Sequence, residues 1–256
     1  YNKLETLSSK LSKYLSPQVY DSIFSGKSEV RVGANRKYLT VFFSDIASFT
    51  ELSDQFEPEI LTKSLNAYLN EMAIIAIQHG ATIDKYIGDA IMAVYGAPFP
   101  GPRDADNAVC SAVQMMRSLH PFNEQRTRTG KEAIHIGIGV NTGEVVSGNI
   151  GSSKRMDYTV IGDGVNLAAR LEGATKPYGT SILISEFTKA TLRDEYRIRE
   201  VDRIRVKGKT HPVAVYEVMD HLEGIAPSLE EIQADYERGL SAYKDRDWRG
   251  AIGHFR

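Results

Sequence analysis

The stretch Val41-Phe42-Phe43-Ser44-Asp45-Ile46 combines strongly β-forming side chains with a carboxylate at its end. The aromatic and β-branched residues from Tyr38 to Asp45 predict a buried strand, in which a charged side chain is costly to desolvate. A second carboxylate, Asp89, follows Gly88 between the apolar runs 81–87 and 90–95. Gly88-Asp89 is a hairpin turn signal, and pairing of this hairpin with the first strand would bring both carboxylates to one edge of the sheet.

The remaining periodicities extend this pattern into an α+β fold. Helical spacing marks residues 61–76, 103–119 and 165–174, and a second hairpin is expected from 134–141 and 144–149 around Thr142-Gly143. Short strands are expected at 158–161, 181–184, 196–206 and 213–218. The order β-α-β-β-α-β-β, with hairpins between helical crossovers, predicts a sheet with helices packed on one face, not a doubly wound parallel sheet.

Three segments are expected along the chain. Residues 1–36 are helical in pattern, with Leu4, Leu7, Leu11 and Tyr14 at a/d spacing and a helix restart at Ser16-Pro17. They read either as a linker helix from an upstream domain or as a surface helix. Residues 37–220 form the main domain. Residues 221–256 are helical again, and Trp248 with Ala251 and Phe255 matches half of a tetratricopeptide-type unit, the start of a downstream repeat.

Composition excludes several classes of protein. The 256 residues carry 31 Lys and Arg against 33 Asp and Glu, a balance that disfavours binding of nucleic acid by phosphate neutralisation. The longest apolar run, 72–77, is far shorter than the roughly 20 residues of a membrane span. The lone Cys110 excludes an internal disulfide and predicts a reducing, cytoplasmic compartment.

The two aspartates have two readings. Neighbouring carboxylates repel one another unless a cation neutralises them, and oxygen ligands suit Mg²⁺ or Mn²⁺. A two-metal phosphoryl-transfer site is therefore one reading. In the other, Asp45 caps the following helix and Asp89 only serves its turn.

Further polar residues suggest nucleotide contacts. Asn166 and Arg170 lie at i and i+4 of one helix, where an amide could hold a ribose and a guanidinium a phosphate; an ordinary polar face is the alternative. Lys85 stands in an otherwise apolar strand, and Thr159 precedes the Asn166 helix. Lys207-Gly208-Lys209 could hold phosphates or form a basic turn.

Together these residues resemble the catalytic domain of the class III nucleotidyl cyclases, over 37–220. The stretch 43–50, FSDIASFT, is similar to the family's first metal motif, and 85–89, KYIGD, to its second. The stretch 162–170, GDGVNLAAR, resembles its transition-state helix. The resemblance implies a ferredoxin-like, palm-type sheet that is rich in antiparallel strands. Separated motifs in the right order outweigh the structural readings given above.

Two positions bear on the choice of substrate. Guanylyl cyclases of the family carry Glu where Lys85 stands and typically Cys where Thr159 stands. Lys85 can donate to adenine N1, whereas guanine N1 carries a hydrogen, so ATP is expected. Thr159 resembles the subclass of bicarbonate-stimulated and many cyanobacterial adenylyl cyclases, and it weakens discrimination slightly because a hydroxyl both donates and accepts.

The resemblance also implies a reaction and a role for each residue. The ATP 3′-hydroxyl attacks the α-phosphorus and expels pyrophosphate, giving cyclic AMP, with two Mg²⁺ or Mn²⁺ per site. The implied metal ligands are Asp45, Asp89 and the backbone carbonyl of Ile46. The implied substrate-binding residues are Lys85 and Thr159 to adenine, Lys209 to the terminal phosphates, and Phe49 and Thr50. The implied catalytic residues are Asn166 to the ribose and Arg170 to the five-coordinate phosphorus.

In the family the site lies between two head-to-tail subunits. This chain carries both halves, so a homodimer with two equivalent sites is expected, with bicarbonate as an activator. Two alternatives stay open: a guanylyl cyclase, which Lys85 opposes, and a catalytically silent nucleotide-binding module, which the presence of every motif opposes.

Overall fold

The structure is a computed structural model that describes residues 6, 14–26, 31–53, 57–205, 212–222 and 229–255. Its elements follow the chain in the order α2 (Pro17–Phe24), β1 (Gly33–Ile46), α3 (Phe49–Ser53), α4 (Pro58–Gln78), β2 (Thr82–Ile87), β3 (Ala90–Tyr95), α5 (Asp104–Arg128), β4 (Ile136–Gly151), β5 (Met156–Ile161), α6 (Asp163–Tyr178), β6 (Ile182–Ser185), α7 (Glu186–Thr191), β7 (Ile198–Ile204), β8 (Val213–Val218), the 3₁₀ turn η1 (Asp220–Leu222), α8 (Leu229–Lys244) and α9 (Trp248–Phe255).

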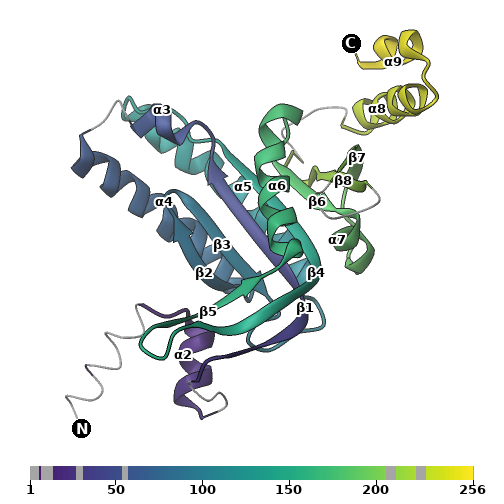
Figure 1. Ribbon diagram of the computed structural model, residues 1–256. Coiled ribbons are helices and arrows are strands. Elements are labelled where there is room, and N and C mark those ends of the chain that lie inside the picture. Colours follow the sequence, from purple (N-terminus) through teal and green to yellow (C-terminus); the bar gives the residue numbers. More distant parts are fainter. Residues whose placement is uncertain are drawn as a thin grey trace.

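One mixed sheet organises the molecule (Figure 1). Its strands lie in the order β2-β3-β1-β4-β6-β8-β7, and β5 pairs with β4 beside this path. Every described pairing is antiparallel except that of β4 with β6. The predicted α+β sheet, rich in antiparallel strands, is therefore confirmed, with β1 next to the β2–β3 hairpin as expected.

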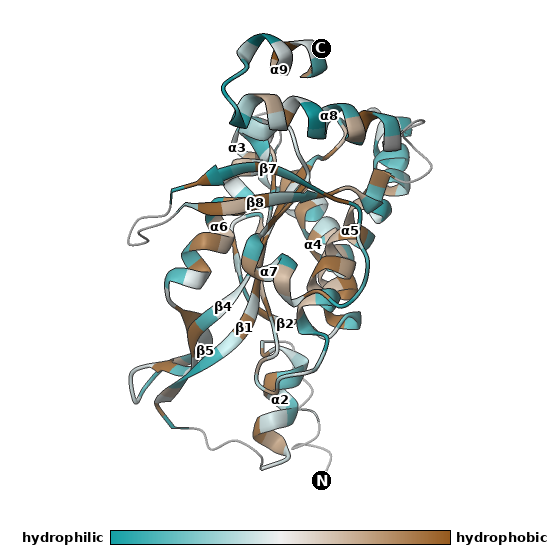
Figure 2. Ribbon diagram, turned by 90° about the vertical axis from the view of Figure 1, so that its right-hand side faces the viewer, coloured by the Kyte–Doolittle hydropathy of each residue, from teal (hydrophilic) through white to brown (hydrophobic). Residues whose placement is uncertain are grey.

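Helices cover both faces of this sheet, so the prediction of helices on one face is wrong. Alternate residues of β1 point to opposite faces. Phe42 packs in one core with Tyr68 of α4 and with residues of α5, whereas Val41 packs in another with Ala168 of α6. Figure 2 shows α6 on one side of the strands and α4 and α5 on the other. The apolar face of α6 was visible in the sequence, but the face of the sheet that it covers was not.

The expected second hairpin does not form. Residues 136–151 are a single strand, β4, which pairs with β1 along its whole length from Gly33 to Ile46. Thr142 and Gly143 lie opposite Thr40 and Leu39, and the hydroxyls of Thr40 and Thr142 hydrogen bond across 2.9 Å. The local Thr-Gly turn signal is overridden because the long partner strand pairs with the backbone on both sides of it.

Other predicted elements are confirmed with shifted ends. The hairpin of β2 and β3 turns at Gly88-Asp89, where Gly88 has a φ of +67°, a conformation that glycine adopts without strain. The helix predicted at 103–119 extends to Arg128 as α5. Helix α2 begins at Pro17. The a/d residues Leu4, Leu7 and Leu11 lie outside the described residues.

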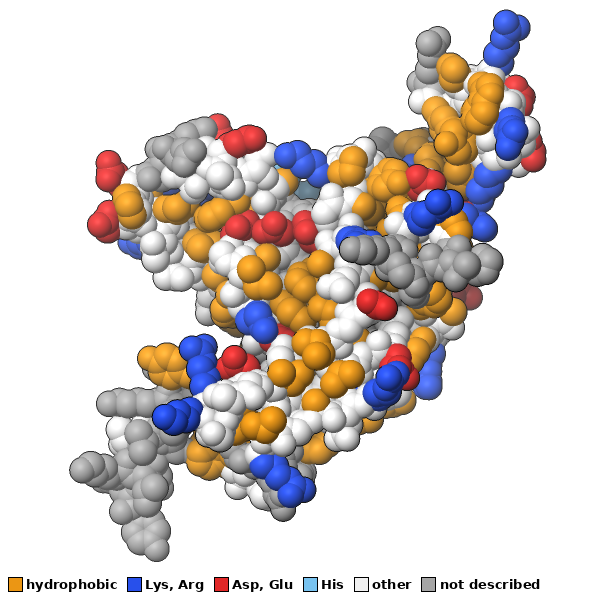
Figure 3. Space-filling view, in the orientation of Figure 1, with side chains coloured by type: hydrophobic (Ala, Val, Ile, Leu, Met, Phe, Trp, Pro, Cys, Tyr) orange, Lys and Arg blue, Asp and Glu red, His pale blue; other side chains and the backbone are white. Residues whose placement is uncertain are grey.

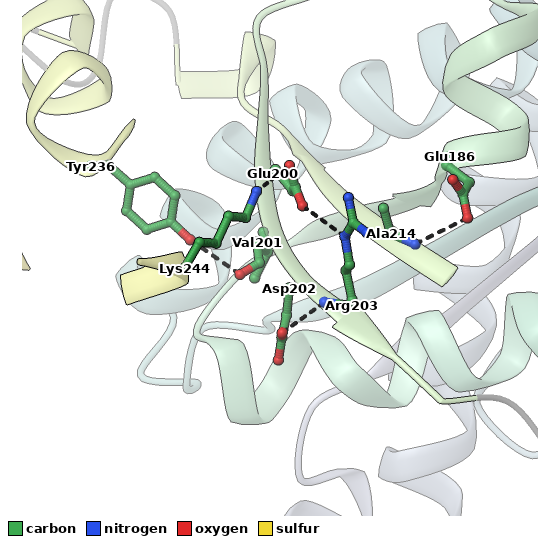
Figure 4. Close-up of polar contacts among 8 residues, drawn as sticks. All are labelled: Glu186, Glu200, Val201, Asp202, Arg203, Ala214, Tyr236 and Lys244. Atoms are coloured by element: carbon green, nitrogen blue, oxygen red, sulfur yellow. Dashed lines mark hydrogen bonds and ion pairs between the residues drawn. The ribbon is translucent and has the colours of Figure 1, made fainter. Parts of the chain in front are cut away.

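The C-terminal helices α8 and α9 lie beside the edge strand β7. Figure 4 shows Lys244 and Tyr236 of α8 reaching Glu200 and Val201 of β7, at 2.8 Å to the Glu200 carboxylate and 3.4 Å to the Val201 carbonyl. The ring of Tyr236 also lies 4.2 Å below the guanidinium of Arg199. The α8–α9 pair therefore rests on the sheet. Whether 221–256 begins a tetratricopeptide-type repeat stays a prediction.

Within the described part of the chain, none of the helices has the length and apolar character that crossing a membrane requires.

Candidate active site

Asp45 and Asp89 meet at one point, as the sequence predicts. Asp45 lies near the end of β1, and Asp89 lies at the tip of the neighbouring β2–β3 hairpin. Both carboxylates accept a hydrogen bond from the backbone N–H of Ile46, Asp45 at 3.0 Å and Asp89 at 3.1 Å. The pairing of β1 with β3 therefore holds two acidic side chains, distant along the chain, against a single donor.

A third carboxylate, that of Glu172 on α6, lies beside this pair. Burial, the hydrogen bond with Asp89 and the charges of Asp89 and Glu172 together raise the pKa of Asp45 to about 7, although the Ile46 N–H acts in the opposite direction. Burial also raises the pKa of Glu172 to about 7, with a contribution from the charge of Asp89. Figure 3 shows acidic side chains gathered in the hollow of the face that carries α6. The site thus concentrates negative charge.

Sequence reasoning missed Glu172. Its approach to the aspartates depends on Gly137 and Gly139 of β4, where a Cβ would lie 2.2 Å from the Thr175 hydroxyl and 2.2 Å from the Glu172 backbone nitrogen, respectively. The spacing Gly137-x-Gly139 was a usable signal: two glycines on one face of a strand permit a helix to approach the backbone closely.

This donor set fits divalent cations that also bind substrate. No three His, Cys, Asp or Glu side chains of the described residues are arranged to hold an ion by themselves. Asp45 and Asp89 alone would leave coordination positions for phosphate oxygens and water, as Mg²⁺ sites in nucleotide enzymes do. The clustered carboxylates with raised pKa are the groups that such a cation would stabilise as anions.

A second cluster joins β2 to β5. The ammonium of Lys85 donates to the hydroxyl of Thr159 across 3.2 Å, so the two expected base-contacting residues do lie together. The carboxylate of Asp84 contacts both: Oδ2 accepts from the Thr159 hydroxyl at 2.6 Å, and Oδ1 lies 3.2 Å from Lys85 Nζ. Sequence reasoning did not single out Asp84.

Asn166 and Arg170 share an exposed face of α6, and neither has a hydrogen-bond or ion-pair partner among the described residues. That face points away from the aspartates of the same chain. Successive residues of an α-helix turn by about 100°, so Arg170 lies about 200° around the helix from Glu172. The structure therefore does not bring Asn166 and Arg170 to Asp45 and Asp89 within one chain.

The remaining predicted residues are only partly placed. Phe49 is half-buried against the main core, and Thr50 is exposed at the start of α3. Ile46 contributes its N–H to both aspartates, whereas metal binding by its carbonyl stays a prediction. Lys207 and Lys209 lie outside the described residues.

Comparison with known proteins agrees with this geometry. The profile of the family described as "Adenylate and Guanylate cyclase catalytic domain" matches residues 33–220. The chain belongs to this family. An adenylate cyclase of Anabaena cylindrica is 37% identical over 85% of the chain, and a terminal-differentiation-specific adenylate cyclase of Dictyostelium discoideum is 37% identical over 99%. The aligned parts span 44% and 12% of these relatives' own lengths.

Solved cyclase structures of both specificities are similar to this fold. The adenylyl cyclase CyaB from P. aeruginosa has 43% identity and a TM-score of 0.67, and the match covers 73% of this chain and 96% of that one. The guanylyl cyclase Cya2 has 39% identity and a TM-score of 0.66, with 73% and 94% covered. These matches establish the cyclase fold. Because they include both specificities, a preference for adenine or guanine has to be argued from this chain's own residues.

Proposed function

We propose that this chain is an adenylyl cyclase domain, which converts ATP to 3′,5′-cyclic AMP and pyrophosphate. The observation that carries the proposal is the contact of Lys85 with Thr159 at 3.2 Å. An ammonium group can only donate, so Lys85 suits the bare N1 of adenine and opposes the N1–H of guanine. The two curated relatives named as adenylate cyclases support the same choice.

The chain's own residues prepare the site for this reaction. The Ile46 amide holds the Asp45 and Asp89 carboxylates together, so they are oriented before substrate arrives. Bound there, two Mg²⁺ or Mn²⁺ would supply the positive charge that acidifies the ribose 3′-hydroxyl and neutralises the phosphates. In this proposal Asn166 orients the ribose, and Arg170 stabilises the charge that develops around the α-phosphorus.

A head-to-tail homodimer completes the proposed site. Asn166 and Arg170 are exposed and turned away from the aspartates of their own chain, which supports a second subunit as the source of one half of the site. In a two-fold dimer the same surfaces meet twice, giving two equivalent sites. Lys85 and Asp89, although close along the chain, would then serve different sites.

The test of the proposed function compares ATP with GTP as substrates in the presence of Mn²⁺, following cyclic nucleotide and pyrophosphate. Preferential turnover of ATP is expected. Preferential turnover of GTP would identify a guanylyl cyclase instead. Nucleotide binding without product from either substrate would identify a silent signalling module.

Bicarbonate stimulation is a separate part of the proposal, supported by Thr159 at the position that resembles the bicarbonate-stimulated subclass. Turnover of ATP is compared with bicarbonate and with equimolar chloride at one fixed pH. A rate that is the same in both salts would remove bicarbonate from the proposal without affecting the proposed cyclase activity.

The lone Cys110 supports a cytoplasmic location.

A further inference from the structure

Asp84 is the most deeply buried acidic group beside the base-contacting residues. Its side chain is 2% exposed, whereas that of Lys85 is 44% exposed. Besides the Thr159 hydroxyl, Asp84 Oδ2 accepts the backbone N–H of Val160 at 3.3 Å. The Asp84 side chain thus links β2 to β5, two strands that do not pair with each other.

A β-bulge explains how consecutive residues serve one cluster. In a regular strand Asp84 and Lys85 would point to opposite faces of the sheet. The register of β2 with β3 shifts between Ile83 and Lys85, which leaves Asp84 as the extra residue. Such a bulge redirects side chains, and here Asp84 Oδ1 comes within 3.2 Å of Lys85 Nζ.

The chemistry of this cluster settles the direction of the Thr159 hydroxyl. A carboxylate only accepts and an ammonium only donates. The single hydrogen of Thr159 Oγ1 is therefore directed to Asp84 at 2.6 Å, and one lone pair accepts from Lys85 at 3.2 Å. The second lone pair of Thr159 Oγ1 remains available, so this oxygen can only accept a hydrogen bond from a ligand.

We infer that Asp84 is a specificity-determining positioning residue, which makes Thr159 an acceptor for the 6-amino group of adenine and a poor partner for a 6-oxo purine. The inference deepens the proposed adenylyl cyclase function and rests on it. A free threonine hydroxyl could turn to donate to a 6-oxo group. When Asp84 holds this hydrogen, a lone pair of Thr159 Oγ1 would face a lone pair of the 6-oxo oxygen, and the two acceptors would repel each other.

The experiment measures kcat/KM for ATP and for inosine triphosphate, whose base carries a 6-oxo group, in the full chain. Asp84→Ala is expected to lower the ATP-to-ITP ratio about tenfold, because the Thr159 hydroxyl can then donate. Asp84→Asn keeps the shape of the side chain and covers the case in which the alanine variant does not fold. It is expected to lower the ratio in the same direction, since its amide can donate to Thr159.

Two controls separate this role from a structural one. Asp157→Asn changes an exposed acid on the same strand, β5, and is expected to leave the ratio unchanged. In a Thr159→Val background, Asp84→Ala is expected to cause no further change in the ratio, because the hydroxyl through which it acts is gone.

The outcomes are distinct. If the wild-type chain prefers ATP but both Asp84 variants keep its ratio, losing activity equally with both nucleotides, then Asp84 only supports the fold and the inference is wrong. If the wild-type chain prefers the 6-oxo nucleotide, the proposed adenylyl cyclase function fails first.

Discussion

Asp45 lies directly opposite Gly137 in the antiparallel pairing of β1 with β4. Because Gly137 has no side chain, Glu172 of α6 reaches this position, and its Oε1 would lie 3.1 Å from a Cβ built there. Strand β4, which pairs with the strand that carries Asp45, therefore packs closely against α6, the helix that carries Asn166 and Arg170. Close packing at Gly137 therefore fixes the position of α6 relative to the sheet.

Gly139→Ala is expected to destabilise the protein by about 1–3 kcal/mol and to reduce cyclase activity. Its Cβ would lie 2.2 Å from the Glu172 nitrogen and 2.3 Å from the Ala168 carbonyl, both backbone atoms that cannot turn aside. Urea unfolding measures the change. The matched control is Gly173→Ala on α6, where a Cβ meets nothing within 4 Å; this variant is expected to gain about 0.5–1 kcal/mol in helix stability. Equal stability of both variants would contradict this packing.

Without divalent cations, Asp45 is expected to make stability fall as pH rises. Its pKa is raised from 3.8 to about 7 in the folded chain, so the folded state binds more protons than the unfolded state across that window. The stabilisation from protonated Asp45 is fully present below pH 3.8, the ordinary pKa, and is lost as the pH rises through about 7. Thermal unfolding in chelator between pH 5 and 8 should therefore show a smaller loss for Asp45→Asn than for the wild-type chain.

Comparison with the variant is needed because His221 acts in the opposite direction. Burial lowers the pKa of His221 to about 4, so its contribution to stability increases as pH rises toward its ordinary value. His221 is the same in both proteins, so the difference between them reports Asp45 together with the carboxylates of Asp89 and Glu172 that interact with it. Parallel stability curves would show that Asp45 does not titrate in this window.

Glu172→Gln is expected to weaken Mn²⁺ binding about tenfold, because it removes a negative charge beside the proposed metal ligands. It should also stabilise the metal-free protein at pH 8 by relieving repulsion with Asp89. Titration calorimetry with Mn²⁺ and thermal unfolding measure the two effects. Glu59→Gln removes an exposed charge on α4 and serves as the control. Unchanged Mn²⁺ affinity in Glu172→Gln would show that its charge does not reach the ions.

Mixing two inactive variants tests the shared site. Asp45→Ala and Arg170→Ala are each expected to lose at least 100-fold in activity, since each removes a charged group from both sites of a homodimer (about 3 kcal/mol of transition-state stabilisation). In a mixed dimer one site keeps both groups, so mixing should restore activity up to half of the wild-type level per heterodimer. Heterodimers that form, as shown by differently tagged subunits, and stay inactive would reject the shared site.

Local sequence predicted the main elements of the site because strand ends and turns are local features. The apolar run that ends at Asp45 and the Gly88-Asp89 turn required no distant information, and their convergence followed from pairing of adjacent strands. The failed hairpin at Thr142-Gly143 has the converse cause. A short turn signal is weak compared with continuous pairing to a long strand, and that pairing involves residues about a hundred positions away.

Residues missed by the sequence analysis act through contacts between distant segments. In the sequence Asp84 is one more polar residue of a strand, and only the bulge in β2 directs it toward Thr159. Glu172 is an ordinary polar position of a helix, and only the missing side chain of Gly137 lets it approach the aspartates. The bulge has no periodic signature in the residues that form it, and the Gly137-x-Gly139 spacing permits a helix to approach without identifying which helix does so.

By itself, the sequence determined most of the helices and strands, the α+β class and the acidic and basic residues available for chemistry, since these depend mainly on neighbours along the chain; the single long strand β4 was the exception. Tertiary structure alone decided which face of the sheet α6 covers, which carboxylates share the Ile46 amide and where the hydrogen of Thr159 points. Those outcomes depend on packing distances and hydrogen-bond partners that exist only after the strands have paired.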